Sequence, residues 1–321
     1  MTPPKIGITL GDPGGIGPEV VLKSLANLSS LPEAHYVLFG SRSVIENERE
    51  ALDLRISLPS ETVSLRDIPA PPDPPGIGSP TAANGSLSFR YFESAVREAR
   101  EGRLLAIVTA PVSKRSWDLA GLTWAGHTEY LTRLFPGAIM FFWSEELKVA
   151  LFTHHIPLKL ALEEVEEKPL LRFIMKLHEN MSRIPIEDFK FLVSGLNPHA
   201  GEEGLLGTEE REKMLPAIAA ARSMGVPIAG PFPPDVVFRE ALHKPDKIVI
   251  ALYHDQGLIP FKLHAFHSGV NVTLGLPFVR TSPDHGTAFD IAGKNIADPT
   301  SMIEAIRLAH RFASSRGKGE G

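Results

Sequence analysis

The 321-residue sequence contains no cysteine. This absence excludes disulfide bonds, thiolate metal sites and a cysteine nucleophile, so a metal ion could be bound only through histidine, aspartate or glutamate. Basic charge is also scarce, because 33 lysines and arginines stand against 38 aspartates and glutamates and give a formal net charge of −5. Binding to nucleic acid or to an anionic membrane normally requires a basic excess, so neither partner is expected.

Long apolar runs are missing as well. No stretch reaches the length needed to cross a membrane, and the first residues lack the pattern of a signal peptide. The hydrophobic fraction of 43% and the charged fraction of 22% are nevertheless ordinary for a folded globular protein. We therefore expect a cytoplasmic protein with a sizeable core, in one large domain or two medium ones.

Strand-like apolar segments alternate with segments of helical periodicity, which predicts an α/β fold. The predicted strands include 6–10, 35–39, 104–109, 147–153, 191–194, 248–253 and 270–274. The predicted helices include 19–28, 87–100, one opened by Pro169, 209–224 with a kink at Pro216, and 301–313. We expect a surface loop over 69–80 and a frayed tail over 316–321.

A glycine-rich loop, GDPGGIGP at 11–18, separates the first predicted strand from the first predicted helix. Its glycines do not fit G-x-G-x-x-G in any register, and two prolines interrupt it, so a dinucleotide site of the Rossmann type is disfavoured. A tight turn with positive φ angles is the better interpretation, and an anion site at the helix start stays open. Asp12 and Glu19 fit helix-start carboxylates and are not assigned to the site.

Three histidines directly follow or close predicted strands: His155 in THHIP, His199 in GLNPHAG and His254 in YHDQG. Neutral imidazole is a common metal ligand, and three of them leave coordination positions open for substrate oxygens. The three lie far apart in the sequence, so spacing alone does not indicate a shared metal, and an ordinary structural role for each stays open. His154 competes with His155, because adjacent residues of an extended chain point in opposite directions.

Together these motifs resemble the 4-hydroxythreonine-4-phosphate dehydrogenase family of vitamin B6 biosynthesis. The matching stretches, in family order from end to end of the chain, are GDPGGIGPE at 11–19, TAPVSK at 109–114, GHTEYL at 126–131, HHIPL at 154–158, GLNPHAGE at 195–202, YHDQGLIPFK at 253–262 and GVNVTLGLPFVRTSPDHGTAFDIAG at 269–293. The resemblance implies a two-domain α/β fold of the isocitrate and isopropylmalate dehydrogenase type, with the active site in the interdomain cleft. The first domain would comprise 1–125 and 294–321, and the second, 126–293, would carry the metal ligands and the dimer interface.

The resemblance also implies a ligand set for a divalent metal ion. The ligands would be His155, His199 and His254, which favours His155 over its neighbour on family grounds alone. Three imidazoles favour Zn²⁺, Co²⁺ or Ni²⁺ over Mg²⁺, which prefers oxygen ligands, although the family tolerates several divalent ions.

The substrate contacts implied by the resemblance are His127, Thr128, Lys262, Asn271 and Arg280, the last three for the phosphate and carboxylate ends. Arg280 offers a planar fork suited to an oxyanion, and Lys262 offers a compact charge. From the residues alone, either could equally be a solvated surface residue. The proton acceptor would be His127 or Asp235, which matches a position near the metal, with a metal-bound water as a third candidate.

A second resemblance concerns the cofactor. The stretch HGTAFDIAGKN at 285–295 is similar to the adenosine-binding loop of isopropylmalate and isocitrate dehydrogenases, which bind NAD or NADP without a Rossmann fold. Phe289 replaces the usual proline, so the path of the loop can differ, and a glycine-rich connection before the last helix is the alternative. The cofactor contacts implied by the resemblance are Gly286, Thr287, Ala288, Asp290 and Asn295.

The family resemblance implies oxidation of 4-phosphooxy-L-threonine by NAD or NADP with a divalent metal. The product, 2-amino-3-oxo-4-phosphooxybutanoate, would lose carbon dioxide and give 3-amino-2-oxopropyl phosphate. Family members are homodimers whose active site is shared between subunits. One alternative is a sister dehydrogenase acting on 4-phospho-threonate, 4-phospho-erythronate or a related diol acid. Others are a metal-dependent hydrolase or lyase and a non-catalytic binding protein, neither of which would need both the cofactor loop and three separate histidines.

Overall fold

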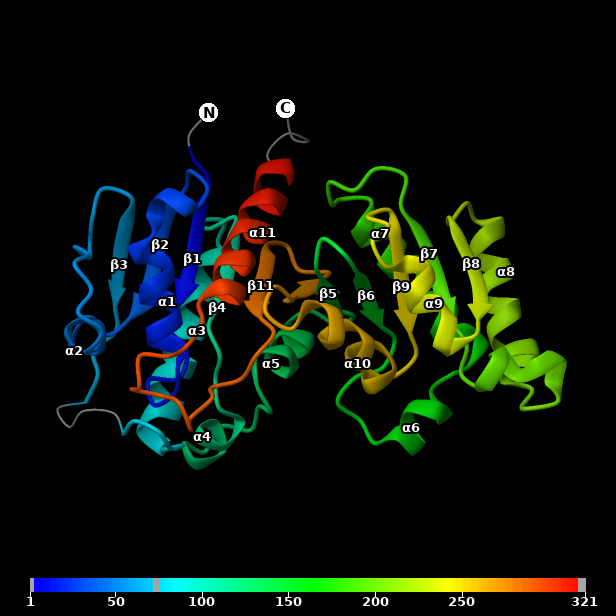
Figure 1. Ribbon diagram of the computed structural model, residues 1–321, viewed down its shortest axis with the longest axis horizontal. Helices are drawn as coiled ribbons and strands as arrows, with labels where there is room; N and C mark the ends of the chain where they lie inside the picture. The colour runs from blue at the N-terminus through cyan, green and yellow to red at the C-terminus, as the bar shows by residue number, and fades with distance from the viewer. Residues whose placement is uncertain (1–2, 72–75, 317–321) are drawn as a thin grey trace. The chain divides into compact units, whose positions relative to one another are not determined.

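The computed structural model describes residues 3–71 and 76–316, and the chain folds into two compact units. Unit 1 comprises Met1–Ala138 and Leu276–Gly321, and unit 2 is the continuous segment Ile139–Gly275. The chain therefore leaves unit 1 once and returns to it for its last strand and last helix (Figure 1). The predicted domain boundaries, after residues 125 and 293, stay a prediction.

Unit 1 is built on a parallel sheet in the order β3-β2-β1-β4-β11. Its strands are β1 Lys5–Thr9, β2 His35–Gly40, β3 Val63–Asp67, β4 Ala106–Thr109 and β11 Val279–Pro283. The other four strands are almost wholly buried, whereas β3 has two exposed residues. Near-continuous apolar strands are expected where helices cover both faces of a parallel sheet.

The helices of unit 1 surround this sheet, and the last of them comes from the far end of the chain. They are α1 Gly17–Ala26, η1 Leu28–Ser30, α2 Arg42–Ala51, α3 Ala82–Arg100, α4 Lys114–Leu119, α5 His127–Leu134 and α11 Thr300–Arg316. The side chain of Thr81 caps α3 by accepting a hydrogen bond from the Asn84 amide, so this helix begins five residues before its predicted start. α11 packs against β4, β11 and α1, and Figure 1 shows it beside the N-terminal strands.

Unit 2 contains a mixed sheet in the order β10-β5-β6-β9-β7-β8. β5 is antiparallel to both of its neighbours, and the remaining pairs are parallel. The strands are β5 Ile139–Trp143, β6 Lys148–Leu151, β7 Lys190–Ser194, β8 Ile228–Phe232, β9 Lys247–Ala251 and β10 Val270–Leu274. β5 has no counterpart among the predicted strands, although its sequence IMFFW is a short apolar run that is buried throughout, as AIVT of β4 is.

The helices of unit 2 are α6 Leu158–Glu163, α7 Glu167–Met181, η2 Pro198–Gly204, η3 Glu210–Met214, α8 Leu215–Ser223, α9 Pro234–Ala241 and α10 His254–Ala265. The helix predicted over 209–224 is thus a π-helical turn, η3, followed by α8. The change of helix type takes the place of the predicted kink at Pro216, which lies in the first turn of α8 and needs no amide hydrogen bond there.

α10 forms although it contains Gly257 and Pro260, two poor helix formers. A Cβ atom at Gly257 would lie only 2.6 Å from a side-chain carbon of Leu151, so glycine lets α10 pack closely on β6. The same region holds the apolar core of unit 2, which includes Phe142, Val149 and Phe261. Tertiary packing therefore outweighs local propensity along this helix.

The observed alternation of strands and helices confirms the α/β class. In the described part of the chain, no helix is both long enough and apolar enough to span a membrane. The described parts of the predicted 69–80 loop contain no helix or strand. Residues 72–75 of that loop, and 317–321 of the predicted frayed tail, lie outside the described residues.

Candidate active site

Arg280 is a buried cation of unit 1, only 2% exposed. β11 pairs in parallel with β4, which brings Thr109, the last residue of β4, beside it. The Arg280 guanidinium donates to Oγ1 of Thr109 from Nε at 3.2 Å and from Nη2 at 2.7 Å, and Nη2 lies 3.3 Å from Nδ1 of His127. Burial lowers the pKa of Arg280 to about 9. An anionic substrate group beside this guanidinium would favour its charged form.

His127 begins α5 and is buried against two aromatic rings. The ring centroids of Phe92 and Trp117 lie 4.4 and 5.6 Å from its own. Burial, and secondly the charge of Arg280, lower the pKa of His127 well below its usual value. Because a guanidinium only donates, Nδ1 of His127 must accept, and the proton of the neutral ring lies on Nε2. That buried Nε2 has no hydrogen-bond partner among the residues described, so it can donate to a substrate oxygen.

We expect the free energy of unfolding to lose a contribution from His127 as the pH falls from about 7 to about 5. In the unfolded chain a histidine titrates near pH 6.5, whereas in the folded protein the pKa of His127 is lowered. Below about pH 6.5 the unfolded chain therefore binds a proton that the folded protein does not bind. The free energy of unfolding then falls by up to about 1.4 kcal/mol for each unit by which the pH is lowered. Urea unfolding across this range should be less pH-dependent in His127→Gln, and an unchanged dependence would contradict the assignment.

The other predicted substrate residues are divided between the two units. Thr128 follows His127 in α5 and is half-buried. Lys262 lies half-buried in α10, and Asn271 lies in β10, both in unit 2. The buried Oδ1 of Asn271 has no hydrogen-bond partner within the described ranges. The structure thus brings Arg280 and His127 into direct contact, and the substrate roles of all five residues stay predictions.

Thr109 is a contact of the candidate site that the sequence analysis did not assign. It lies in the quoted motif TAPVSK, and its hydroxyl receives two hydrogen bonds from Arg280. A polar residue that closes a buried strand is a signal for such a role, because ligands bind at the carboxyl ends of parallel strands. That signal alone does not name Arg280 as its partner.

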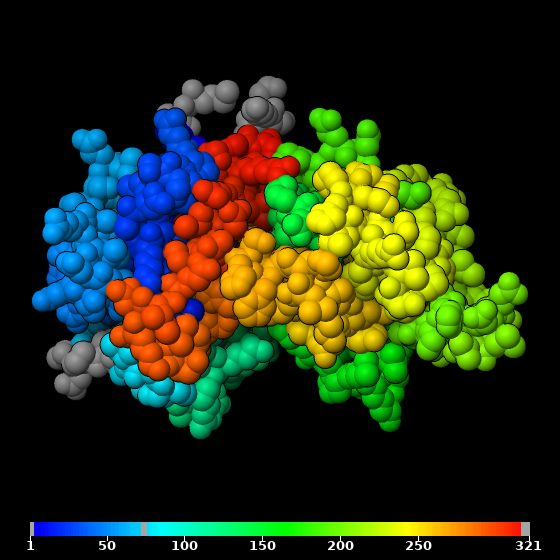
Figure 2. All heavy atoms as spheres, in the orientation of Figure 1, coloured from blue at the N-terminus to red at the C-terminus, as the bar shows by residue number. Residues whose placement is uncertain are grey.

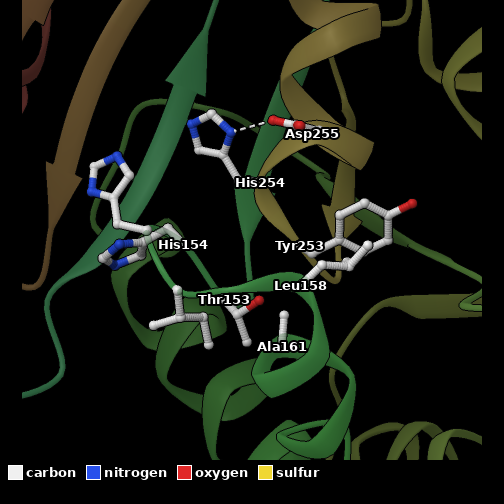
Figure 3. A pocket seen from close by; sticks show the side chains of 9 residues that line it. Thr153, His154, Leu158, Ala161, Tyr253, His254 and Asp255 are labelled. Atoms are coloured by element: carbon white, nitrogen blue, oxygen red, sulfur yellow. Dashed lines mark hydrogen bonds and ion pairs between the residues drawn. The ribbon is translucent and has the colours of Figure 1, made fainter.

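A cavity of about 250 Å³ in unit 2 brings together histidines from two parallel strand ends (Figure 3). β6 and β9 pair in parallel, so the segments that follow them open at the same edge of the sheet. The ring centroids of His155 and His254 lie 5.6 Å apart. The cavity is lined by Thr153, His154, His155, Ile156, Leu158, Ala161, Tyr253, His254 and Asp255.

His254 is oriented by its neighbour, since its Nδ1 lies 2.7 Å from Oδ1 of Asp255 (Figure 3). A carboxylate in this position fixes the proton on Nδ1 and leaves Nε2 as the nitrogen that can coordinate a metal. His155 adopts a left-handed backbone conformation, with φ of 51°. Its neighbour His154 has a buried Nδ1 without a hydrogen-bond partner in the described chain, and burial, then the charge of His254, lower its pKa.

The donor chemistry of this cavity fits a borderline divalent metal such as Zn²⁺ or Co²⁺, which imidazole nitrogens bind well. Over residues 3–71 and 76–316, no group of three His, Asp or Glu side chains is placed to hold a metal. His199 does not line the cavity, and its side chain is 66% exposed. Asp235, in the first turn of α9, is exposed and does not line it either.

The backbone around His199 is unusual, because five consecutive residues are in the left-handed region. Such a conformation costs about 1–2 kcal/mol for each residue that has a Cβ. Strain of this kind persists only where neighbouring groups hold it, and it is common at functional sites. The five residues and their φ angles are His199 at 51°, Ala200 at 54°, Gly201 at 84°, Glu202 at 44° and Glu203 at 56°.

The predicted cofactor loop, 285–295, contacts the glycine-rich loop of unit 1. The Ile16 amide donates to the carbonyl of Thr287 at 2.9 Å, and a Cβ at Gly15 would lie 2.6 Å from that oxygen. Among the glycines of this N-terminal loop, only Gly11 has a positive φ, so the prediction of positive angles is right there and wrong for the others. Close approach to Thr287 explains Gly15 instead.

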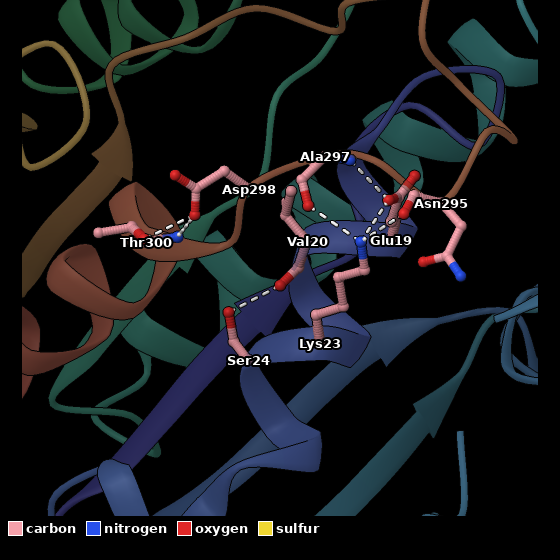
Figure 4. Close-up of polar contacts among 8 residues, drawn as sticks. All are labelled: Glu19, Val20, Lys23, Ser24, Asn295, Ala297, Asp298 and Thr300. Carbon is pink, nitrogen blue, oxygen red and sulfur yellow. Dashed lines mark hydrogen bonds and ion pairs between the residues drawn. The ribbon is translucent and has the colours of Figure 1, made fainter. Parts of the chain in front are cut away.

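The end of the cofactor loop is fastened to α1 (Figure 4). The buried carboxylate of Glu19 accepts hydrogen bonds from the Ala297 amide at 2.8 Å and from Nζ of Lys23 at 2.7 Å. Lys23 also donates to the carbonyls of Ala297 and Asn295, at 3.0 and 3.3 Å. The Glu19 carboxylate therefore acts at the loop and not merely as a helix-start charge.

The loop itself lies at the surface of unit 1, in the orange region before α11 (Figure 2). Gly286, Asp290 and Asn295 are exposed, and Thr287 and Ala288 are half-buried. Ala288 and Asn295 have positive φ angles of 42° and 57°. These residues form one continuous stretch with accessible groups, which is compatible with the predicted cofactor contacts.

Comparison with known proteins gives matches over almost the whole chain. The family model described as "Pyridoxal phosphate biosynthetic protein PdxA" matches residues 32–309. A 4-hydroxythreonine-4-phosphate dehydrogenase of Sulfurihydrogenibium sp. is 40% identical, over 95% of this chain and 97% of its own. A D-threonate 4-phosphate dehydrogenase of Cupriavidus necator is also 40% identical, over 98% of both chains.

Solved structures agree with these matches. The crystal structure of 4-hydroxythreonine-4-phosphate dehydrogenase from Klebsiella pneumoniae has a TM-score of 0.84 and 39% identity, over 97% of this chain and 98% of that one. Isocitrate dehydrogenase from Methylococcus capsulatus, at 15% identity, has a TM-score of 0.52 over 98% of this chain and 87% of its own. The second likeness concerns the fold alone, and it confirms the predicted fold type.

Proposed function

Because this chain belongs to the family of pyridoxal phosphate biosynthetic protein PdxA and is a dehydrogenase of that type, we propose that it oxidises 4-phosphooxy-L-threonine. The oxidant would be NAD or NADP, and the product would be 2-amino-3-oxo-4-phosphooxybutanoate, which decarboxylates to 3-amino-2-oxopropyl phosphate. The observation that carries the proposal is the contact of the buried Arg280 with Thr109 and His127. It supports the proposal because a cationic fork, beside an N–H donor without a hydrogen-bond partner among the described residues, suits an anionic hydroxy-acid substrate.

Each proposed substrate contact has a role that follows from its side-chain chemistry. Arg280 would bind an oxyanion through its fork, and Lys262 and Asn271 are the other proposed contacts of the phosphate and carboxylate ends. His127 would donate from Nε2 to a substrate oxygen, with Thr128 beside it. This geometry favours His127 as a donor over the role of general base, so Asp235 and a metal-bound water stay as the proposed candidates for the base.

The proposed metal ligands are His155 and His254, with His199 as the third. When bound, a divalent metal supplies Lewis-acid chemistry that lowers the pKa of the substrate alcohol. Asp255 would keep His254 in the coordinating tautomer. Zn²⁺ is our first choice, with Co²⁺ and Mg²⁺ as alternatives, because imidazole ligands suit the first two better.

For the cofactor we propose NAD or NADP bound at the 285–295 loop. The accessible Gly286 and Asp290, and the strained Ala288, belong to the stretch that resembles an adenosine-binding loop. The hydrogen bonds of Glu19 with Ala297 and Lys23 hold the end of this loop against α1 and would keep the loop preorganised.

We also propose a homodimer that shares its active site. α10 carries His254 at its first residue and, further along, the exposed apolar side chains of Ile259 and Leu263, and Phe266 caps its C-terminal end; the three are 62%, 79% and 67% exposed. Their spacing of four and three residues puts them on one face of the helix, and exposed apolar faces of this kind usually bind a partner. In the proposed dimer, both copies would contribute residues to the metal site. The cytoplasmic location stays a prediction.

The second candidate substrate is D-threonate 4-phosphate, because the relative from Cupriavidus necator is as similar to this chain as the relative from Sulfurihydrogenibium. The two substrates differ in an amino group against a hydroxyl group. The hydrolase, lyase and binding-protein alternatives are set aside, since the chain is a dehydrogenase of this family.

One assay tests the proposal. The protein is mixed with Zn²⁺ or Co²⁺, NAD or NADP and 4-phosphooxy-L-threonine, and the absorbance of the reduced nicotinamide is followed. We expect kcat/KM for this substrate to exceed that for D-threonate 4-phosphate at least tenfold. The reverse order would select the sister activity, and no reduction with either would overturn both.

A further inference from the structure

We propose that Glu210 is a positioning residue: its carboxylate holds the left-handed turn that presents His199 to the metal. The inference rests on the proposed function, in which His199 is a ligand. Glu210 is the first residue of the π-helical turn η3, and it is 3% exposed. It lies outside the predicted site, and no step of the reaction uses it.

The hydrogen bonds of the Glu210 carboxylate come from the segment that enters the turn. Oε1 accepts from the amides of Leu196 and Asn197 at 2.8 and 2.7 Å, and Oε2 accepts from Nδ2 of Asn197 at 2.9 Å. One buried carboxylate thus receives three N–H groups just before His199. Hydrogen bonds to a charged acceptor are stronger than neutral ones, which suits a segment that must be held against its own conformational preference.

The turn is also shaped to touch this carboxylate. Gly201 lies within the left-handed run, and a Cβ there would come 2.8 Å from Oε2 of Glu210 and 3.0 Å from the carbonyl oxygen of Gly207. A side chain at Gly201 would therefore push the carboxylate away from Asn197. The π-helical geometry starts at Glu210 itself, and such turns are frequent at functional sites.

Glu209 provides a matched comparison on the same helix start. Oε2 of Glu209 also accepts a hydrogen bond from Nδ2 of Asn197, at 2.8 Å. This bond links Glu209 to the side chain of the segment before His199. Glu210 alone of the two accepts the backbone amides of that segment. Loss of the Glu209 carboxylate should leave the turn in place, whereas loss of the Glu210 carboxylate should release it.

The test measures metal binding directly. The full chain is freed of metal and titrated with Co²⁺, and the visible absorption of the bound ion gives affinity and coordination geometry without any turnover. Glu210→Gln keeps the side-chain volume, but it replaces one accepting oxygen by an NH₂ group, which cannot accept a hydrogen bond from Leu196 or Asn197. We expect it to weaken Co²⁺ binding at least tenfold, as for other residues that orient metal ligands. Glu209→Gln should change the affinity less than twofold.

A second pair of variants leaves Glu210 intact. Gly201→Ala should weaken Co²⁺ binding at least tenfold. Gly225→Ala is its control, because Gly225 has a similar φ of 87° and nothing within 4 Å of an added Cβ, so it tests backbone strain alone. The melting temperature of every variant is measured, and affinity is compared only for the folded fraction.

His199→Ala separates the two ideas. If it weakens Co²⁺ binding while Glu210→Gln and Gly201→Ala bind as the parent does, the positioning role is overturned and the ligand assignment stands. If His199→Ala itself binds Co²⁺ unchanged, the ligand assignment fails and the inference falls with it. Lower melting temperatures with unchanged affinity would show a purely structural role, which also overturns the inference.

Discussion

Replacing His254 or His155 by alanine should lower kcat/KM by about a thousandfold or more. The reason is that each removes one of the two imidazoles that meet in the cavity of unit 2, with ring centroids 5.6 Å apart. A metal held by these imidazoles would supply Lewis-acid stabilisation of several kcal/mol, and each 1.36 kcal/mol is a factor of ten. Steady-state kinetics in Zn²⁺ or Co²⁺, together with the metal content of the purified variants, measure both consequences.

His264→Ala is the control for this result. His264 lies on the same helix, α10, but is exposed and does not line the cavity. Its removal should leave kcat/KM and metal content within about twofold of the parent. Full metal content in either His155→Ala or His254→Ala would be incompatible with the proposed ligand set, whatever the activity.

Substitution of Arg280 should have the next largest effect. Arg280→Met removes the cationic fork, and we expect kcat/KM to fall by about a hundredfold to a thousandfold, because truncating one partner of a buried charge pair costs about 2–5 kcal/mol. Arg280→Lys keeps a charge without the fork and should lose about tenfold to a hundredfold. The lower kcat/KM should come mainly from a higher KM, since the guanidinium binds the substrate and does not react.

Stability should respond differently from activity in these variants. Arg280→Met gives up hydrogen bonds to Thr109 and His127, but it also removes the cost of burying a cation. We therefore expect the free energy of unfolding in urea to change by less than about 2 kcal/mol. Arg115→Met, at an exposed arginine of the same unit, is the control. Equal KM values for Arg280→Met and this control would exclude a substrate role for Arg280.

Much of the architecture could be predicted from local patterns. Short apolar segments such as AIVT of β4 and VNVTL of β10 lie close to their predicted positions, because buried strands need continuous apolar runs. The helix α10 could not be predicted in this way, since its stability comes from packing. Gly257 and Pro260 oppose a helix locally, and only the approach to β6 accounts for one there.

The candidate site shows the same division. The pairing of His155 with His254 follows from strand ends that meet at one edge of a parallel sheet, and the motifs indicated both residues. The roles of Thr109 and Glu210 could not be predicted, because each acts by accepting hydrogen bonds from a residue distant in sequence or from the backbone. Side chains that hold other groups in place carry no spacing signal of their own.

The interrupted course of unit 1 has a consequence for how the protein is made. β4 ends at Thr109, but its neighbour β11 begins only at Val279, after the whole of unit 2 has left the ribosome. Until then β4 is the bare edge of an apolar parallel sheet, which is a template for pairing with other chains. Unit 2, by contrast, is continuous and can fold as it emerges. Nascent chains that stall within unit 2 are therefore the species most prone to aggregate, and chaperone demand should peak there.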